Sequence, residues 1–348
     1  MARQSIIPFF IPMEGCPHRC IFCDQVAISG KSSLPKAADI SAALGELAPD
    51  SGAEAAFYGG SFTCLSRERQ AYYLDAAGEA LAAGRIGGIR ISTRPDAIDG
   101  ETCVFLRKKG VVTVELGIQS FDDEVLRLSQ RGYNGETAAV ACRAVVASGL
   151  RLGVQLMTGL PGDRRELDVA AVRQAGELGA RLLRIYPTLV LEHTPLAELY
   201  RQGSYAPQEL KEAVKTAAAM CAVARAREMT LIRVGINTSA DVEESLVAGP
   251  YHPAFGGLVK EELKQAQLAE LLDGLTRDDV AALFFPANEL PLIFGDKRGA
   301  LRRLAVKYPS LAFIPDDGLP PGLLRLEVGG RTEESREDDF CRRFAARL

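Results

Sequence analysis

The chain has 348 residues, with 41 Lys and Arg against 45 Asp and Glu and a formal net charge of -4. Apolar residues at 47% and charged residues at 25% are typical of a globular protein and exclude a disordered, collagen-like or coiled-coil chain. The acidic balance excludes a basic nucleic-acid coat but leaves room for a local basic patch. No apolar run approaches the roughly 20 residues of a membrane span, and no signal peptide is evident. We therefore expect a cytoplasmic protein without a membrane segment.

Short apolar runs alternate with amphipathic stretches from residue 5 to about residue 235, a rhythm typical of a parallel sheet. The predicted strands are residues 6–11, 54–58, 88–92, 111–117, 152–157, 182–187 and 230–234. The predicted helices are residues 37–47, 67–82, 101–109, 136–148, 166–178 and 208–227. This order predicts an α/β fold with a full or partial (β/α) barrel, in which functional residues gather at the carboxyl ends of the strands.

The rhythm ends at about residue 236, where residues 236–257 hold turn-forming glycine and proline pairs and are expected to form an ordered loop. The elements predicted beyond it are helices at 259–275, 297–307 and 334–347 and strands at 280–285, 311–314 and 323–328. We therefore predict two domains, a barrel domain of residues 1–235 and a small C-terminal α+β region of residues 236–348.

Three of the eight cysteines, Cys16, Cys20 and Cys23, lie in one loop directly after the first predicted strand. Three thiolates in a C-x3-C-x2-C arrangement can hold three irons of a [4Fe-4S] cluster and leave its fourth iron open for a small ligand. A zinc site would need a fourth ligand, and His18 is the nearby candidate at a spacing unlike the usual zinc motifs. The pattern favours the cluster over zinc and over cysteines that only fill the core.

At this loop the sequence resembles the radical S-adenosylmethionine (SAM) superfamily, whose defining motif is C-x3-C-x-aromatic-C, with Phe22 as the aromatic residue here. The resemblance implies a [4Fe-4S] cluster whose open iron chelates SAM. It also implies reductive cleavage of SAM to a 5'-deoxyadenosyl radical, with an electron donor such as flavodoxin or ferredoxin. The protein then supplies binding, orientation and exclusion of side reactions.

Further residues match the superfamily's cofactor contacts. Gly59, Gly60 and Ser61 follow the second predicted strand, where the family motif grips the methionine amino group; alone, a Gly-Gly pair would indicate only a turn. Gln119 and Arg131 match residues that contact the ribose hydroxyls and the methionine carboxylate. An arginine suits a carboxylate because it can donate two parallel hydrogen bonds.

Three more cofactor-binding residues are predicted at strand ends: Ser92, Arg94 and Gln155. Ser92 stands where related enzymes carry a Glu, and Gln155 stands where the coproporphyrinogen-oxidase branch has an Asp. Both replacements exchange a charged cofactor contact for a neutral one.

Within the superfamily, residues 7–199 resemble the radical domain of the elongator catalytic-subunit family. The resemblance lies in the cluster loop and in sequence motifs such as Ser92-Thr93-Arg94-Pro95 and Gly159-Leu160-Pro161-Gly162. Members of that family modify the wobble uridine of transfer RNA (tRNA) with acetyl-coenzyme A. Nothing after Gly235 reads as an acetyl-coenzyme A loop, so acetyl transfer is not implied. The resemblance predicts a short, stand-alone bacterial form without an acetyltransferase domain, with tRNA as a candidate partner.

Tyr186 and His252 are the predicted catalytic residues on the substrate side. Tyr186 ends the sixth predicted strand, and His252 lies in the stiff turn Gly249-Pro250-Tyr251-His252-Pro253, which would fix the direction of its imidazole. His193, Asn237 and Tyr251 are weaker candidates. For each, a packed or solvated side chain without a catalytic role is the competing interpretation.

A basic turn lies in the C-terminal region, where Lys297, Arg298, Arg302 and Arg303 surround the stretch Gly295 to Gly299. The turn is similar to the phosphate-clamping loop of a KH-type RNA module, although three residues separate its glycines and a KH loop has two. A plain helix start with a solvated basic face is the alternative.

The sequence predicts a radical SAM enzyme that acts on RNA. One alternative is coproporphyrinogen-oxidase-like radical chemistry on a small molecule, although that branch usually has Tyr where this chain has Phe22. Another is a non-catalytic iron-sulfur or RNA-binding protein, which would have no need of the methionine-binding residues Gly59, Gly60, Gln119 and Arg131.

Overall fold

The computed structural model describes residues 5–11, 16, 20–24, 34–236 and 240–348. The chain divides into two compact units, one of Met1–Ala213 with Met229–Pro253 and one of Val214–Glu228 with Ala254–Leu348. Helix α9 (Leu210–Ala226) therefore begins in one unit and ends in the other. The sequence-based boundary between residues 235 and 236 stays a prediction.

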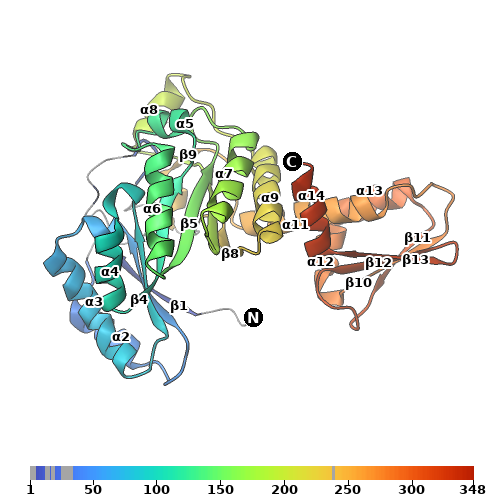
Figure 1. The fold of residues 1–348 in the computed structure, drawn as a ribbon. Coiled ribbons are helices and arrows are strands. Elements are labelled where there is room, and N and C mark those ends of the chain that lie inside the picture. Colours follow the sequence, from blue (N-terminus) through green and yellow to red (C-terminus); the bar gives the residue numbers. More distant parts are fainter. Residues whose placement is uncertain (1–4, 12–15, 17–19, 25–33, 237–239) are drawn as a thin grey trace. The chain divides into compact units, whose positions relative to one another are not determined.

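The first unit is built on a seven-stranded sheet in the order β1-β2-β3-β4-β5-β6-β8. Its strands are β1 (Ile6–Ile11), β2 (Glu54–Gly59), β3 (Gly88–Thr93), β4 (Val111–Gln119), β5 (Arg151–Thr158), β6 (Leu182–Pro187) and β8 (Thr230–Val234). Every neighbouring pair is parallel. Figure 1 shows the sheet curling into an open half-barrel with helices along its outer face, which confirms the predicted partial (β/α) barrel.

The helices of this unit are α2 (Ala37–Gly45), α3 (Arg67–Ala82), α4 (Gly100–Lys108), α5 (Asp123–Leu128), α6 (Gly135–Ala147), α7 (Arg165–Glu177), α8 (Pro195–Arg201) and α10 (Ala240–Ser245). Several begin at a side chain that accepts a backbone N–H, as the preference for Asp, Asn and Thr at helix starts predicts. Asp99 caps α4 and Asn134 caps α6.

Both faces of the central strands are buried, but by different kinds of residue. In β3 the alternate residues Ile89 and Ile91 are apolar and fully buried, and so are Val114 and Leu116 in β4. The residues between them are charged: Arg90 in β3 and Glu115 in β4 are 2% exposed. Because successive strand residues point to opposite faces, one face of the half-barrel packs apolar residues and the other carries charge.

The loop predicted at residues 236–257 contains more secondary structure than its turn residues indicate. Helix α10 is followed by β9 (Leu246–Ala248), which pairs antiparallel with β7 (Val190–Leu191) after β6. These strands have two or three residues, too few for a sequence pattern, and long-range pairing forms them. Asn237 lies outside the described residues.

The second unit contains a four-stranded sheet in the order β11-β10-β12-β13. Its elements are α11 (Phe255–Leu271), β10 (Ala281–Phe285), α12 (Leu290–Phe294), α13 (Gly299–Lys307), β11 (Leu311–Pro315), β12 (Leu323–Val328), β13 (Arg331–Arg336) and α14 (Glu337–Ala346). Strand β10 is parallel to β11 and antiparallel to β12. Its apolar core includes Leu283, Phe285, Ile293 and Leu324, all fully buried.

The predicted helix at 334–347 is wrong in its first turn, because Arg331–Arg336 forms β13 and α14 starts only at Glu337. The strand has an almost wholly polar sequence and is formed by antiparallel pairing with β12. The helix predicted at 259–275 runs instead over Phe255–Leu271. Within the described parts of the chain, no helix is both long and apolar enough to cross a membrane.

Candidate functional site

The cysteine loop follows β1 and is anchored to elements far along the chain. Cys20 is buried, whereas Cys16 and Cys23 are half-buried. The N–H of Ile21 donates to the carbonyl of Ser129 at 3.4 Å, and the carbonyl of Ile21 accepts from the N–H of Leu196 at 2.8 Å. Ile21 is fully buried in an apolar cluster that also holds residues of β5 and α8. Residues 20–23 are therefore held at the carboxyl edge of the half-barrel.

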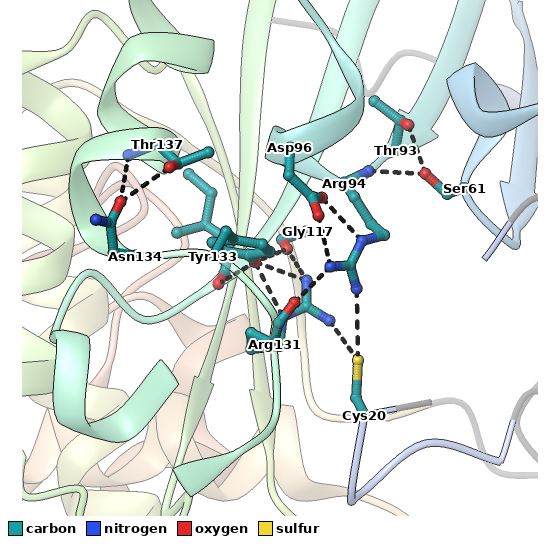
Figure 2. A network of polar contacts seen from close by, with 11 residues as sticks. Cys20, Ser61, Thr93, Arg94, Asp96, Gly117, Arg131, Tyr133, Asn134 and Thr137 are labelled. Atoms are coloured by element: carbon teal, nitrogen blue, oxygen red, sulfur yellow. Dashed lines mark hydrogen bonds and ion pairs between the residues drawn. The ribbon is translucent and has the colours of Figure 1, made fainter. Parts of the chain in front are cut away.

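Two buried arginines converge on the Cys20 sulfur (Figure 2). Nη1 of Arg131 lies 2.8 Å from Sγ of Cys20, and Nη1 of Arg94 lies 3.8 Å from it. Each arginine is 5% exposed. Arg94 also binds the carboxylate of Asp96 through two bonds of 2.9 and 2.8 Å, and it donates to the carbonyl of Arg131. Arg131 is held by Tyr133, whose hydroxyl accepts from its Nε at 2.9 Å.

The donor set fits an iron-sulfur cluster. Burial raises the pKa of the Cys23 thiol to about 12, and the neighbouring Cys20 and Cys16 add to the effect. A bound metal centre would remove this cost because it stabilises thiolates directly. No three His, Cys, Asp or Glu side chains among the described residues could hold one metal ion together. Cubane ligands bind different irons, so a cluster does not require such a group. His18, the ligand considered for zinc, lies outside the described residues.

The glycine pair Gly59 and Gly60 at the end of β2 lies against Ile11, the last residue of β1. Gly59 has a φ of +110°, and a Cβ there would lie 2.8 Å from the carbonyl oxygen of Ile11. The N–H of Gly60 donates to that same oxygen at 2.8 Å. Only glycine fits Gly59's backbone conformation and close approach. Gly60 and Ser92 line one small pocket between β2 and β3.

Ser61 ties the ends of β2 and β3 together. Its hydroxyl lies 2.8 Å from the hydroxyl of Thr93 and accepts from the N–H of Arg94 at 3.1 Å. This contact orients the turn from which Arg94 reaches the cysteine loop (Figure 2).

Gln119, the last residue of β4, contacts Gln155 in the second half of β5. Nε2 of Gln155 donates to Oε1 of Gln119 at 3.1 Å. Gln119 has a φ of +70°. Residues other than glycine rarely adopt this backbone conformation, and those that do are often found at functional sites. The structure thus brings six predicted residues, Gly59, Ser61, Arg94, Gln119, Arg131 and Gln155, to the same edge as Cys20.

Sequence reasoning missed a buried ionic network below this edge. Glu115 in β4 accepts from Arg184 of β6 at 2.5 Å, from Arg90 of β3 at 2.7 Å and from the Tyr58 hydroxyl of β2 at 2.8 Å. Arg90 also bonds Glu54 at 2.7 Å. Burial raises the pKa of Glu115, but the charges and hydrogen bonds of Arg184 and Arg90 outweigh it and hold the pKa below its ordinary value. The sequence signal that could have revealed this network is a charged residue within an otherwise apolar strand, basic in β3 and β6 and acidic in β4.

The two predicted substrate residues lie in different surroundings. Tyr186 is half-buried, packs against the apolar cluster that includes Cys20, and has its hydroxyl 3.5 Å from Nη1 of Arg184. His252 is half-buried beyond β9, the strand that pairs with β7. His193 is exposed with a φ of +60°. A catalytic role for Tyr186 or His252 stays a prediction.

Cysteines, buried arginines and a strained backbone at the carboxyl edge of a half-barrel are typical of an enzyme that binds its cofactor there. Residues 10–171 match the radical SAM superfamily model, and residues 180–265 match the radical SAM C-terminal domain model. The chain belongs to the radical SAM superfamily and is a radical SAM enzyme. Its cofactors are a [4Fe-4S] cluster and SAM.

The relatives support the elongator-like resemblance. A tRNA uridine(34) acetyltransferase of Methanocaldococcus infernus is 32% identical over 159 residues, which cover 44% of this chain and 30% of the relative. Elongator complex protein 3 of Mus musculus is 28% identical over 179 residues, covering 45% and 33%. The chain spans half or less of the length of the curated acetyltransferases that it matches.

Among solved structures, the fold is similar to that of the archaeal Methanocaldococcus infernus Elp3 with an N-terminal deletion. The TM-score is 0.58 at 23% identity, and the match covers 75% of this chain and 63% of the other. This likeness shows a shared fold.

Proposed function

We propose that this enzyme cleaves SAM reductively at a cluster held by Cys16, Cys20 and Cys23 and uses the resulting radical to modify tRNA. The observation that carries the proposal is the 2.8 Å contact between Nη1 of Arg131 and Sγ of Cys20. It sets a buried cation within reach of both the cluster ligand and any SAM carboxylate bound beside it. When bound, the two cofactors supply the electron and the carbon radical that abstracts hydrogen from the substrate.

The roles of the chain's own residues follow from their positions. Arg131 offers a guanidinium to the methionine carboxylate, and Tyr133 and the carbonyl of Gly117 hold that guanidinium in place. Arg94, which the carboxylate of Asp96 orients, stabilises the thiolate of Cys20.

The backbone at the end of β2 supplies a second set of contacts to SAM. At Gly59 and Gly60 the absence of side chains lets carbonyl and N–H groups approach the methionine amino group. Gln119, which hydrogen-bonds Gln155, offers amide atoms to the ribose hydroxyls. Ser92 lies close to the same pocket as Gly60 and contributes a neutral hydroxyl to the cofactor environment.

The substrate assignment is supported by the relatives named as tRNA uridine(34) acetyltransferases. We assign Tyr186 to the substrate side because it packs beside the cysteine loop, and His252 as a second substrate-side residue on the neighbouring turn. The cellular setting that fits this function is the cytoplasm, with flavodoxin or ferredoxin as electron donor.

Anaerobic reconstitution with iron and sulfide tests the cofactor half of the proposal. We expect about four irons per chain and the visible absorbance of a cluster. Changing any one of Cys16, Cys20 or Cys23 to Ala should abolish that absorbance, whereas Cys64→Ala, in the short turn after β2, should keep it. Stoichiometric zinc with no iron uptake would contradict the proposal.

The catalytic half is tested with the iron-loaded chain, dithionite, SAM and a tRNA transcript. We expect 5'-deoxyadenosine to form in the parent and not in Cys20→Ala, and to form faster when tRNA is added. Formation that is equally fast without tRNA and with an unrelated RNA would argue against tRNA as the substrate.

A further inference from the structure

A row of exposed cations lies on one side of the second unit. Its members are Lys297, Arg298, Arg302, Arg303 and Lys307, and we call them the α13 basic face. All five side chains are exposed, and within residues 5–11, 16, 20–24, 34–236 and 240–348 none of them forms an ion pair.

Other arginines of the same unit behave differently. Arg325 pairs with Glu334 at 3.1 Å, and Arg343 pairs with Glu270 at 2.6 Å. Arg342 pairs with Asp339 at 2.5 Å. Exposed arginines of this unit commonly pair with a carboxylate. Lys307 lies over the ring of Tyr308, 4.8 Å from its centroid, and the other four cations of the face leave their charge available to a partner.

The fold holds this face in a defined shape. Helix α13 buries Ala300 and packs Leu304 against the apolar core, and the buried Tyr308 follows its last turn. The cations therefore occupy the side turned away from the core. Lys297 and Arg298 have φ angles of +47° and +58°, so the turn before the helix projects two cations from a tight, non-helical backbone.

The turn and the helix form one surface. A Cβ at Gly299 would lie 3.6 Å from Nη1 of Arg303, so the Arg303 side chain folds back over the turn. The guanidinium of Arg303 and the cations of the turn can thus contact neighbouring phosphates of one strand.

Charge complementarity identifies the partner. Residues 295–307 contain five cations and the carboxylate of Asp296, and the Glu261 carboxylate of α11 accepts from the N–H of Asp296 at 3.2 Å, so the local charge is 5 - 2 = +3 in a chain of net charge -4. A polyanion would otherwise be repelled by the chain, so it needs such a local site. A membrane surface would be met by several large exposed apolar residues beside the cations. Helix α13 exposes only Val306 among its described large apolar residues, and Leu304 packs against the core.

We infer that the α13 basic face binds the sugar-phosphate backbone of RNA. The inference rests on the proposed function, because it supplies a binding surface for the tRNA that the first unit would modify. It assigns to the second unit a role in substrate affinity without base recognition, since phosphate contacts position an RNA but do not read its sequence.

The test measures tRNA binding by filter retention at several salt concentrations, with the full iron-loaded chain and an unmodified tRNA transcript. The variant carries Lys297→Gln, Arg298→Gln, Arg302→Gln and Arg303→Gln. Each lost phosphate contact lowers the magnitude of the slope of log affinity against log salt by roughly 0.7 to 0.9, so four lost contacts should lower it by about 3 to 4 and the affinity by on the order of tenfold or more.

A charge-matched control separates the effect of losing the α13 basic face from the effect of lowering the net charge of the chain. It carries Arg277→Gln, Arg331→Gln, Arg342→Gln and Arg343→Gln, four exposed arginines of the same unit outside the face. We expect the control to keep the parent's slope, and we expect both variants to keep the parent's melting temperature and its tRNA-independent cleavage of SAM.

The outcomes are distinguishable. Equal slopes for the parent and the α13 variant overturn this inference and leave the proposed function standing. Failure of the parent to retain tRNA at low salt overturns both. Retention of the parent by anionic vesicles, lost in the α13 variant while tRNA binding is unchanged, would assign the face to a membrane surface and overturn the inference.

Discussion

Replacing Glu115 by Gln should unfold the half-barrel at a markedly lower temperature. Glu115 is 2% exposed and is the carboxylate on which Arg184 relies, because Arg90 has Glu54 as a second partner and no second carboxylate contacts Arg184 in the described structure. The variant would leave the guanidinium of Arg184 buried with neutral side-chain acceptors, the amide oxygen at position 115 and the hydroxyls of Tyr58 and Tyr186.

The size of the effect follows from the burial of the pair. Breaking a buried ion pair by removing one partner costs about 3 to 5 kcal/mol. Arg184 retains some access to solvent, with 11% of its side chain exposed, so the lower end of that range applies. For a unit of this size, 1 kcal/mol shifts the melting temperature by roughly 2 to 4 °C, so Glu115→Gln should lower it by about 6 to 12 °C.

Calorimetry of the full chain measures the shift, and a double variant assigns its cause. Glu115→Gln with Arg184→Met also removes the unpaired guanidinium of Arg184, so the double variant should regain part of the lost stability. Glu124→Gln, which breaks the exposed pair of Glu124 and Arg127, is the control and should leave the melting temperature nearly unchanged.

The pH dependence has a definite sign. The pKa of Glu115 is depressed in the folded chain, so its contribution is present above the unfolded pKa of about 4.3 and is lost as the pH falls through the folded value. The gap between the parent and Glu115→Gln should be full at pH 7 and shrink in acid. A single variant that melts within about 2 °C of the parent at pH 7, well short of that shift, would refute the reasoning.

Three further changes test the site and its surroundings. Arg131→Ala should weaken SAM binding to the iron-loaded chain about 10- to 150-fold, because a charge-assisted contact contributes about 1.5 to 3 kcal/mol; unchanged affinity in equilibrium binding would put the carboxylate elsewhere. Gly59→Ala should lower both SAM affinity and melting temperature, since its Cβ would meet the carbonyl at the end of β1, whereas Gly78→Ala, with open space around it in α3, should keep the SAM affinity and raise the melting temperature slightly. Asp168→Asn should raise the melting temperature at pH 8 more than at pH 4.5. Burial and the charge of Asp163 raise the pKa of Asp168 well above its ordinary value, so the charged form costs stability as the pH rises through that pKa; an equal shift at both pH values would show that titration is not the cause.

The sheet could be predicted from sequence because its strands are short apolar runs bounded by turn residues. All seven strands of the half-barrel lie within two residues of their predicted bounds, and the order along the chain fixed a parallel sheet. Strand β13 could not be found this way, since its polar residues carry no alternation and its pairing with β12 makes it a strand.

The candidate site was only partly accessible to sequence reasoning. The spacing of Cys16, Cys20 and Cys23 and the glycines after β2 are local patterns, so a motif reveals them. The anchoring of Ile21 by Ser129 and Leu196 joins residues more than 100 positions apart. Such contacts depend on tertiary packing, which no local pattern encodes.

The most direct test of the account is nucleoside mass spectrometry of tRNA from a strain that lacks this chain, complemented with the parent or with Cys20→Ala. The account predicts that one modified nucleoside disappears in the deletion, returns with the parent and stays absent with Cys20→Ala. Identical nucleoside profiles in all three strains would contradict a role in tRNA modification.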